Sequence, residues 1–288
     1  MIERASLFNL RVKGRDAEAI YYFIEQANRP VSYSEILIYS AKKSLKFKCK
    51  TCLKTYSLQE AISNNFSCLE CGKRVEETVI SEALKFLELL SFIKKISERN
   101  DPEYVLQKKI HLPFNLAILE AIVSLEDLNY AMEYKKALSV CLEYYGKIFK
   151  SPQEFATFLN ANIPERTLTI NKNKAENWLL LFSDLGIISR LSGGYIISLD
   201  PHLMLELLDI YNKETKSKNR IKLESFLKFI KKFLPSESTL PKAVMHSLQT
   251  LERLNKIRLA TSPDDISRKY LFDDGRYIRE VMIIDENS

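Results

Sequence analysis

Four of the five cysteines form two pairs of identical spacing, Cys49-x2-Cys52 and Cys68-x2-Cys71. A two-residue gap lets one tight turn aim both thiolates of a pair at one ion, and Gly72 suits such a turn after the second pair. The pattern predicts a structural Zn²⁺ site with these four cysteines as ligands. Four thiolates close the coordination shell and leave no position for water, so we expect this metal to hold shape and not to catalyse.

Two disulfides are the alternative reading of the same cysteines. Disulfides belong to oxidising compartments, and residues 1–10 carry Glu3 and Arg4 without the apolar run of a secretory signal. Spacing and compartment together therefore favour zinc. A module this small has little core of its own, so its folding should depend on the ion. The odd cysteine, Cys141, lies in an apolar stretch and is expected to be a small buried residue.

The cysteine segment resembles a known kind of zinc ribbon. The residues that carry the resemblance are Phe47-Lys48-Cys49-Lys50-Thr51-Cys52, Tyr56-Ser57-Leu58-Gln59-Glu60-Ala61 and Asn65-Phe66-Ser67-Cys68-Leu69-Glu70-Cys71-Gly72. They are similar to the ribbon of archaeal transcription factor E, which follows a winged helix and assists promoter opening. The likeness covers about 30 of the 288 residues. It departs from that pattern at Lys50 and Leu69, where such knuckles often carry proline. The resemblance implies a ribbon and not that factor's task, because one fold hosts many functions.

Length and composition limit the remaining chain. At 288 residues we expect two or three domains, and 46% hydrophobic residues are ample for packed cores. Only seven glycines favour helices over sheet-rich folds. No apolar run of membrane-spanning length occurs. A net charge of +6 permits nucleic acid as a partner without demanding it. These properties predict a cytoplasmic or nuclear protein, with the cytoplasm preferred and no membrane partner.

Helical periodicity, capping signals and turn residues define the elements. Ser32-x-x-Glu35 and Ser151-Pro152-x-Glu154 are strong helix starts, and Gly193-Gly194 marks a tight hairpin. The helices are predicted at 16–28, 32–39, 77–91, 113–123, 129–149, 151–159, 173–185, 201–211, 223–234 and 241–254. The strands are predicted at 92–96, 104–107, 187–191, 195–198, 257–260, 269–272 and 277–284.

Helices followed by a hairpin are the order of a winged helix, and the chain shows this order three times. We predict a mainly α protein with small β-hairpins (α+β), built as a winged-helix-like unit at 1–112, a winged helix at 113–200, and a linker helix with a C-terminal winged helix at 201–288. The zinc ribbon, at about 45–76, would be inserted between the second and third helices of the first unit. Residues 212–222 are read as a polar linker. An internal echo supports the repeat: Leu87-x2-Leu90-Ser91, Phe182-x2-Leu185-Gly186 and Leu251-x2-Leu254-Asn255 each precede a predicted strand.

Nucleic acid is the first candidate partner, and the third helix of a winged helix is the element that enters a major groove. Helix 77–91 is acidic and would be repelled by phosphate, whereas helix 241–254 places Lys242, His246, Gln249 and Arg253 on one face. Arg258, Arg268 and Lys269 lie beside it in the presumed wing. The alternative is an ordinary solvated helix face, because charged stripes are the usual outer surface of an amphipathic helix.

Two further basic clusters occur. Lys42, Lys43, Lys46, Lys48, Lys50 and Lys54 come without an acid among residues 42–54. Phe47 and Tyr56 are interleaved with them and would offer stacking faces beside phosphate-binding charges. Lysines and Arg220 in the 213–222 linker form the other cluster, for which plain solubility is the alternative.

Catalysis is not expected. The sequence has no Walker lysine loop, no G-x-G-x-x-G and no H-E-x-x-H, and its three histidines lie far apart. The sequence therefore predicts a non-enzymatic, DNA-associated subunit of a larger DNA-handling complex, in transcription, chromosome handling or antiviral and anti-plasmid defence, with mainly backbone contacts to DNA and no small-molecule substrate. The alternative is a protein–protein adaptor without DNA contact. By architecture alone, the arrangement resembles the tandem winged-helix (KITE-like) subunits of SMC-type ATPases.

Overall fold

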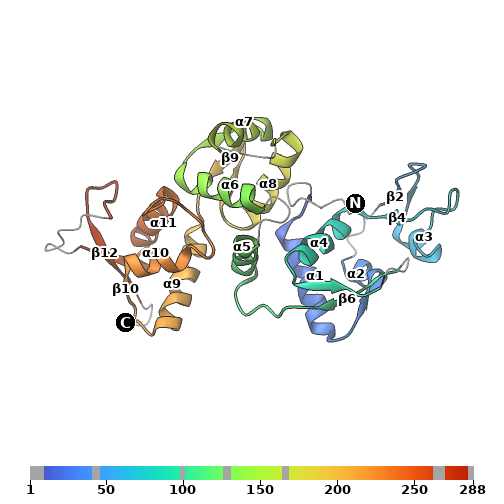
Figure 1. The fold of residues 1–288 in the computed structure, drawn as a ribbon, viewed down its shortest axis with the longest axis horizontal. Coiled ribbons are helices and arrows are strands. Elements are labelled where there is room, and N and C mark those ends of the chain that lie inside the picture. Colours follow the sequence, from blue (N-terminus) through green and yellow to red (C-terminus); the bar gives the residue numbers. More distant parts are fainter. Residues whose placement is uncertain are drawn as a thin grey trace. The chain divides into compact units, whose positions relative to one another are not determined.

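The computed structural model describes residues 10–40, 46–97, 101–125, 131–163, 169–261 and 270–284. Helices dominate, and the strands form small antiparallel sheets (Figure 1). The chain divides into two compact units, Met1–Ala117 and Ile118–Ser288. The three predicted domains, with boundaries at residues 112 and 200, stay a prediction.

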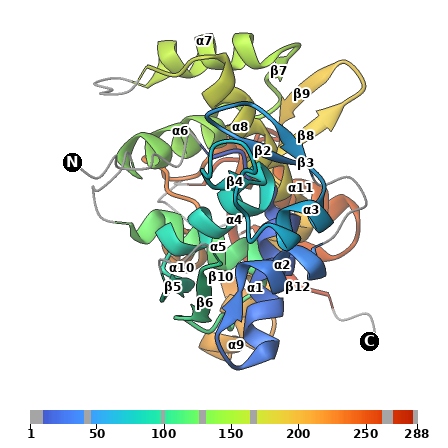
Figure 2. The same cartoon turned by 90° about the vertical axis from the view of Figure 1, so that its right-hand side faces the viewer.

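The first unit contains one helical repeat and the ribbon. Its elements are α1 (Gly14–Ala27), β1 (Val31–Ser32), α2 (Tyr33–Tyr39), β2 (Phe47–Cys49), β3 (Thr55–Tyr56), α3 (Leu58–Ser63), β4 (Val75–Glu76), α4 (Thr78–Leu89), β5 (Ile93–Lys95) and β6 (Glu103–Leu106). The ribbon lies between α2 and α4, where the sequence predicted it. In both views β2, β3, β4 and α3 group together (Figures 1 and 2).

Aromatic packing and one hydroxyl organise the first unit. Tyr21 of α1 is fully buried and lies 6.0 Å from Phe92 and 5.8 Å from Phe114 between ring centres. Its hydroxyl donates to the carbonyl of Lys108 at 3.2 Å and accepts from the amide of Ile110 at 2.8 Å. Burial in this setting raises the pKa of Tyr21. The hydroxyl therefore ties α1 to the segment that follows β6.

The second unit contains two helical repeats. After α5 (Phe114–Ser124), which crosses the boundary between the units, its elements are α6 (Ala131–Glu143), β7 (Ile148–Phe149), α7 (Pro152–Asn162), α8 (Lys172–Asp184), β8 (Ile188–Leu191), β9 (Gly194–Ile197), α9 (Pro201–Thr215), β10 (Arg220–Lys222), α10 (Leu223–Ile230), α11 (Lys242–Arg253), β11 (Ile257–Thr261) and β12 (Ile278–Ile283). Cys141, which the sequence predicted to be buried, is fully buried, and so is Trp178.

The three repeats share one topology. Each runs helix, short strand, helix, helix and hairpin, apart from the inserted ribbon in the first. In each, the short strand pairs with the last hairpin strand, which gives the sheet orders β1-β6-β5, β7-β9-β8 and β10-β12-β11. All of these pairings are antiparallel. The internal echo read from the sequence therefore corresponds to a repeated order of elements.

The third helix of every repeat ends in the same way. Ser91, Gly186 and Asn255 adopt left-handed backbone, with φ of 59°, 77° and 54°. The next amide in each case donates back to the helix: Phe92 to Leu87, Ile187 to Phe182, and Lys256 to Leu251, at 2.9, 2.9 and 3.0 Å. This bond satisfies a carbonyl that a helix end otherwise leaves without a partner. In the first and third repeats a glutamate also accepts from the hairpin, Glu88 from Lys95 and Glu252 from Leu259.

Several predicted boundaries differ from the structure. The short strands β1, β7 and β10 were missed, because two or three residues are too few to show alternation. The segment 212–222 is not a plain linker, since α9 continues to Thr215 and β10 begins at Arg220. Helix 129–149 is shorter in the structure, as α6 ends at Glu143 and β7 follows. The strand predicted at 269–272 begins outside the described residues, and Leu271 forms an isolated bridge with Tyr277. The capping bonds of Ser32 and Ser151 are present as predicted.

Candidate metal centre

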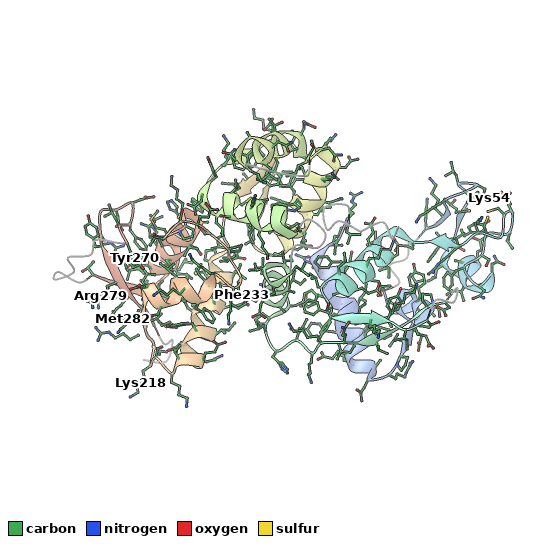
Figure 3. All side chains as sticks on the ribbon, viewed as in Figure 1. Lys54, Lys218, Phe233, Tyr270, Arg279 and Met282 are labelled. Carbon is green, nitrogen blue, oxygen red and sulfur yellow. The ribbon has the colours of Figure 1, made fainter. Side chains whose placement is uncertain are left out.

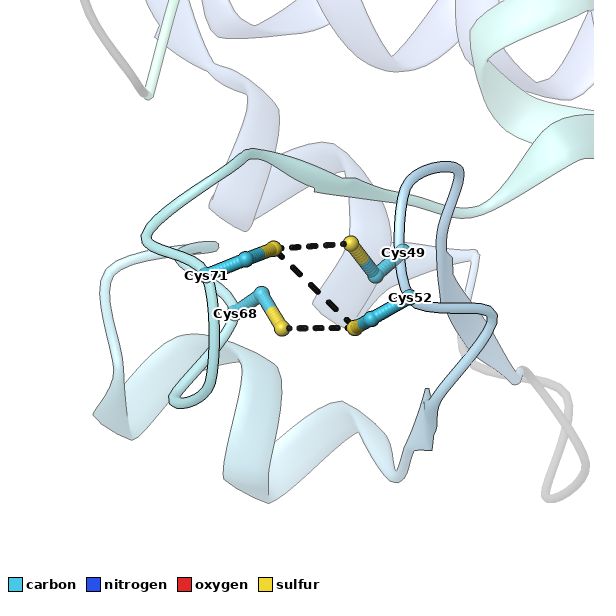
Figure 4. A group of neighbouring side chains, drawn as sticks. All are labelled: Cys49, Cys52, Cys68 and Cys71. Carbon is cyan, nitrogen blue, oxygen red and sulfur yellow. Dashed lines mark hydrogen bonds between the residues drawn. The ribbon is translucent and has the colours of Figure 1, made fainter.

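The two cysteine pairs come together at one point of the ribbon. All four Sγ atoms lie within 4.8 Å of one another (Figure 4). The Sγ–Sγ distances are 3.4 Å for Cys49 and Cys71, 3.3 Å for Cys52 and Cys68, and 4.0 Å for Cys52 and Cys71. A tetrahedral zinc site with Zn–S bonds of about 2.3 Å requires sulfurs about 3.8 Å apart. All four cysteines are free thiols and not disulfides, so the donor set and its spacing fit one tetrahedral Zn²⁺.

Two nearly identical turns aim the sulfurs. In the first, the amide of Cys49 donates to the carbonyl of Lys54 at 2.9 Å, and the amide of Leu53 donates back to Cys49 at 3.0 Å. In the second, Cys68 donates to Lys73 at 2.7 Å, and Gly72 donates to Cys68 at 2.9 Å. Leu53 and Gly72 hold equivalent left-handed positions, with φ of 62° and 64°. The glycine in the second turn is therefore the expected residue, and the first turn uses a leucine where glycine is easier.

A tyrosine supports one ligand from outside the cysteine set. The Tyr56 hydroxyl lies 3.1 Å from Cys68 Sγ and accepts from the amide of Leu69 at 3.2 Å, so its own proton points to the sulfur. This hydrogen bond lowers the pKa of Cys68 to about 6 and raises the pKa of Tyr56 to about 12. Hydrogen bonds to ligand sulfurs stabilise the thiolate that binds a metal and orient it.

The aromatic residues of the ribbon are its core. Phe47 and Phe66 are fully buried with their ring centres 6.0 Å apart, and Phe66 also lies 5.4 Å from Tyr33 of α2. Tyr56 is 8% exposed. The prediction that Phe47 and Tyr56 offer stacking faces for bases is therefore wrong. Their side chains point inward, because Phe47 alternates with the lysines of β2 and falls on the same side as Cys49.

The lysines of the ribbon lie on the opposite side of β2. Lys46, Lys48 and Lys50 are exposed, whereas Phe47 and Cys49 between them are buried. Lys48 is in register with Thr55 of β3 and Glu76 of β4. Lys54 forms an ion pair with Glu70, which links the two turns. Lys42 and Lys43 lie outside the described residues.

The middle of the predicted binding face on α11 is covered. Gln249 is only 6% exposed, which removes it from any accessible face. His246 stacks on Tyr145 at 4.2 Å between ring centres, and its Nε2 lies 3.1 Å from a carboxylate oxygen of Asp273. α11 packs against α6 and α9 in addition to its own hairpin. A helical wheel for 241–254 shows the four side chains on one face, but not the partners that cover that face.

The remaining predicted contact residues are dispersed. Lys242 and Arg253 are exposed at the two ends of α11, and Arg258 is exposed on β11. Arg268 and Lys269 lie outside the described residues. The structure thus brings together the four cysteines, whereas the ribbon lysines and the α11 side chains belong to different compact units.

Sequence reasoning missed two functional residues of the ribbon. Tyr56 was read as a stacking ring, and Leu53 was not singled out. A signal for both is present in the sequence. Phe47, Cys49 and Tyr56 have the alternation of buried strand residues, and Leu53 directly follows Cys52, as Gly72 follows Cys71.

Comparisons of the chain with protein-family models, with curated proteins and with solved structures return no match. Among the described residues, no helix combines the length and apolar character needed to cross a bilayer. In the part of the chain that the structure describes, the four cysteines are the group of side chains that could hold a metal ion.

Proposed function

We propose that this chain is a non-catalytic, cytoplasmic nucleic-acid-associated protein that displays a structural zinc ribbon on three winged-helix units. The ribbon would contact the phosphate backbone through the outer face of β2. The observation that carries this proposal is the alternation along residues 46–50, which exposes Lys46, Lys48 and Lys50 and buries Phe47 and Cys49. Lys48 on β2, with Lys46 and Lys50 at the two ends of the strand, places three cations on one side of the ribbon, where phosphates could bind.

The repeated topology supports winged helices as the scaffold. Helix, strand, helix, helix and hairpin, with the short strand added to the hairpin, occur three times. In a DNA-reading winged helix, the third helix must be free to enter the major groove. Here α11 buries seven residues, including Gln249, and α4 carries Glu82 and Glu88. We therefore propose backbone contacts by the ribbon and not base reading by a third helix.

The contact should be electrostatic and insensitive to sequence. Lysine ammonium groups bind phosphate oxygens but carry no code for base edges. Each phosphate neutralised releases close to one counterion, so affinity should fall steeply as salt rises.

The test measures binding of zinc-loaded full-length protein to labelled duplex and single-stranded DNA by fluorescence anisotropy, over a salt series. The variant combines Lys46→Glu, Lys48→Glu and Lys50→Glu. If three phosphate contacts are lost, the slope of log affinity against log salt for duplex should become shallower by about 2.7.

A matched control changes the same number of charges on the second repeat, with Lys147→Glu, Lys150→Glu and Lys172→Glu, all exposed in the structure. Equal losses of DNA affinity in both variants would show that only net charge matters. That result would reject the ribbon as the contact surface. Zinc content of the ribbon variant, measured by elemental analysis, checks that the ribbon is still folded.

A protein adaptor is the second candidate, and one observation favours it. Leu53 and Leu69, which belong to the two cysteine turns, are 62% and 74% exposed. Large exposed apolar side chains on a rigid turn are common at protein contacts. In this reading the chain joins a larger ATPase or nuclease assembly, such as an SMC-type complex, without touching DNA. Absence of any DNA binding at low salt would leave the adaptor as the better proposal.

A further inference from the structure

The connection between α9 and β10 is an ordered turn of unusual backbone. Lys216, Lys218 and Asn219 all adopt left-handed conformations, with φ of 52°, 50° and 63°. Non-glycine residues hold such conformations only when their surroundings enforce them. Here Asn212 and Asn219 enforce the turn. The Asn212 side chain donates to the Asn219 side chain at 2.7 Å and accepts from its amide at 3.0 Å.

The turn leads directly into a sheet with a basic outer face. On β10, Ile221 is buried and the flanking Arg220 and Lys222 are exposed. Arg220 is in register with Met282 of the central strand β12, and Met282 is in register with Arg258 of β11. Residues in register on adjacent strands point to the same side of a sheet. Arg220 and Arg258 therefore flank Met282 at a separation of about 10 Å, two strand spacings.

Acidic neighbours neutralise only part of this face. Glu280 of β12 accepts a hydrogen bond from Nε of Arg220 at 2.6 Å. Glu214 precedes the turn, and its Oε1 lies 3.7 Å from Nζ of Lys232. Figure 3 places Lys218 and Met282 along the same side of this part of the chain. We call Lys218, Arg220, Lys222 and Arg258 the C-terminal basic face.

We infer that the C-terminal basic face is a second binding surface for the phosphodiester backbone of nucleic acid. This inference rests on the proposed function and places the contact on the hairpin sheet and not on the face of α11. The sheet brings its cations together, whereas the exposed cations of α11, Lys242 and Arg253, stand at its two ends. Arginine and lysine are the side chains that bind phosphate oxygens most strongly. Duplex DNA carries one negative charge per about 1.7 Å, so a face about 10 Å across meets several phosphates.

The surface fits a nucleic acid better than a membrane. Membrane-surface segments combine basic residues with a broad apolar face that enters the lipid. The residue between the two arginines is Met282, which is only partly exposed, and the apolar Ile221 and Val281 face the core. The C-terminal basic face therefore has charge and rigid backbone, and its apolar part is limited to Met282 and the exposed Ile284 beside it.

Two contact surfaces on one chain should bind cooperatively. Once one surface holds a strand of nucleic acid, the other meets the same molecule at a high effective concentration. Loss of either surface should therefore weaken binding to a long duplex by about tenfold or more at low salt.

The test compares four full-length, zinc-loaded proteins: wild type, the ribbon triple variant (Lys46→Glu, Lys48→Glu, Lys50→Glu), a sheet triple variant (Lys218→Glu, Lys222→Glu, Arg258→Glu), and the control triple variant on the second repeat (Lys147→Glu, Lys150→Glu, Lys172→Glu). All substituted positions are exposed. Arg220 is retained because its ion pair with Glu280 links β10 to β12. Each protein is titrated with labelled duplex over a salt series, and with vesicles containing anionic lipid.

We expect the sheet variant to lose about tenfold or more in duplex affinity at low salt, with a shallower salt slope, whereas the control changes little. An unchanged affinity in the sheet variant together with a loss in the ribbon variant would overturn this inference and leave the proposed function standing. A loss in the sheet variant alone would support the C-terminal basic face and reject the ribbon contact. A loss confined to the vesicle titration would identify a membrane surface and overturn the inference, as would the absence of DNA binding by all four proteins.

Discussion

The zinc ribbon and the three helical repeats use different means to hold their shapes. In the second repeat, Trp178 lies 4.0 Å from Phe182 and 4.8 Å from Tyr134 between ring centres, and all three side chains are buried. The ribbon has a small core around Phe47 and Phe66, and two of its turns converge on four thiols.

This contrast assigns a separate source of stability to each region. A repeat with a large apolar core stabilises itself by removing that surface from water. A segment with few buried side chains cannot offset the chain entropy lost on folding and needs a crosslink, which in the ribbon is the ion. We therefore expect the two regions to respond to different perturbations, and four predictions test this expectation.

Removal of the metal should have the largest effect. Chelation, or Cys68→Ser, should unfold residues 46–76 while the helical repeats keep their structure, because binding of structural zinc contributes about 10 kcal/mol or more to the folding of such modules. Elemental analysis should find about one zinc per chain in wild type and a loss in the variant.

The matched control is Cys141→Ala, which changes the buried cysteine outside the ribbon. That variant should retain zinc. A fully folded ribbon after chelation, seen as unchanged amide resonances, would contradict the assignment of its stability to the ion.

Removal of the indole of Trp178 should destabilise the second unit and leave the zinc ribbon folded. Trp178→Ala deletes a buried ring and should reduce the free energy of unfolding of the second unit by about 3–5 kcal/mol. Denaturant unfolding followed by circular dichroism measures the loss, and zinc content should not change. Trp178→Phe retains most of the packing and should cost less. Loss of zinc from Trp178→Ala would show that the two regions are not independent.

Two adjacent glycines in the hairpin of the second repeat should respond differently to substitution, with a smaller loss of stability than Trp178→Ala. A Cβ at Gly194 would overlap the carbonyl oxygen of Phe149 on β7, whereas one at Gly193 meets nothing within 4 Å. Gly194→Ala should therefore destabilise the second unit by about 1–3 kcal/mol. The adjacent Gly193→Ala is the control and should be close to neutral. Equal thermal-unfolding midpoints for the two variants would contradict this expectation. They would mean that β7 shifts to accommodate the new Cβ without loss of stability.

A fall in pH should produce the smallest loss of stability. It acts at α2, whose Tyr33 contacts Phe66 of the ribbon. Arg29 and the amide of Ser32 hold the Glu35 carboxylate and lower its pKa to about 2. A lowered pKa in the folded state stabilises the protein above the unfolded value of about 4.5, and this contribution disappears as pH falls from about 4.5 toward 2. The ion pair is exposed and screened, so the contribution is small. Arg29→Gln should raise the pKa of Glu35 in an NMR titration, and an unchanged value would contradict this account.

The sequence predicted the features that depend on local residues. Cysteine spacing identified the metal ligands, Ser32 and Ser151 identified two helix starts, and Gly186 identified a helix end. The echo at Ser91 and Asn255 also predicted helix ends, because serine and asparagine at a break between apolar residues occupy the same left-handed position as glycine. Such signals act within a few residues and can be read from one sequence.

Features that depend on distant partners were not predictable in this way. Gln249 is buried and its side chain hydrogen-bonds with Asp274, while α11 packs on α6 and α9. No local pattern in 241–254 encodes those neighbours. The strands β1, β7 and β10 exist because they pair with the last strand of each hairpin, not because two or three residues prefer extended backbone. The sequence identified the basic residues of 213–222 and Arg258, but not the sheet that joins them, because β10 was not predicted.

The pairing of β2 with β4 has a practical consequence. Lys48 is in register with Glu76, so the chain enters and leaves the ribbon on adjacent antiparallel strands, about 5 Å apart. A short turn in place of residues 49–75 would bridge that distance, so the ribbon can be deleted without separating the segments on either side of it. A truncated protein made in this way would retain the helices on both sides and would allow the metal-bearing segment to be grafted onto another carrier.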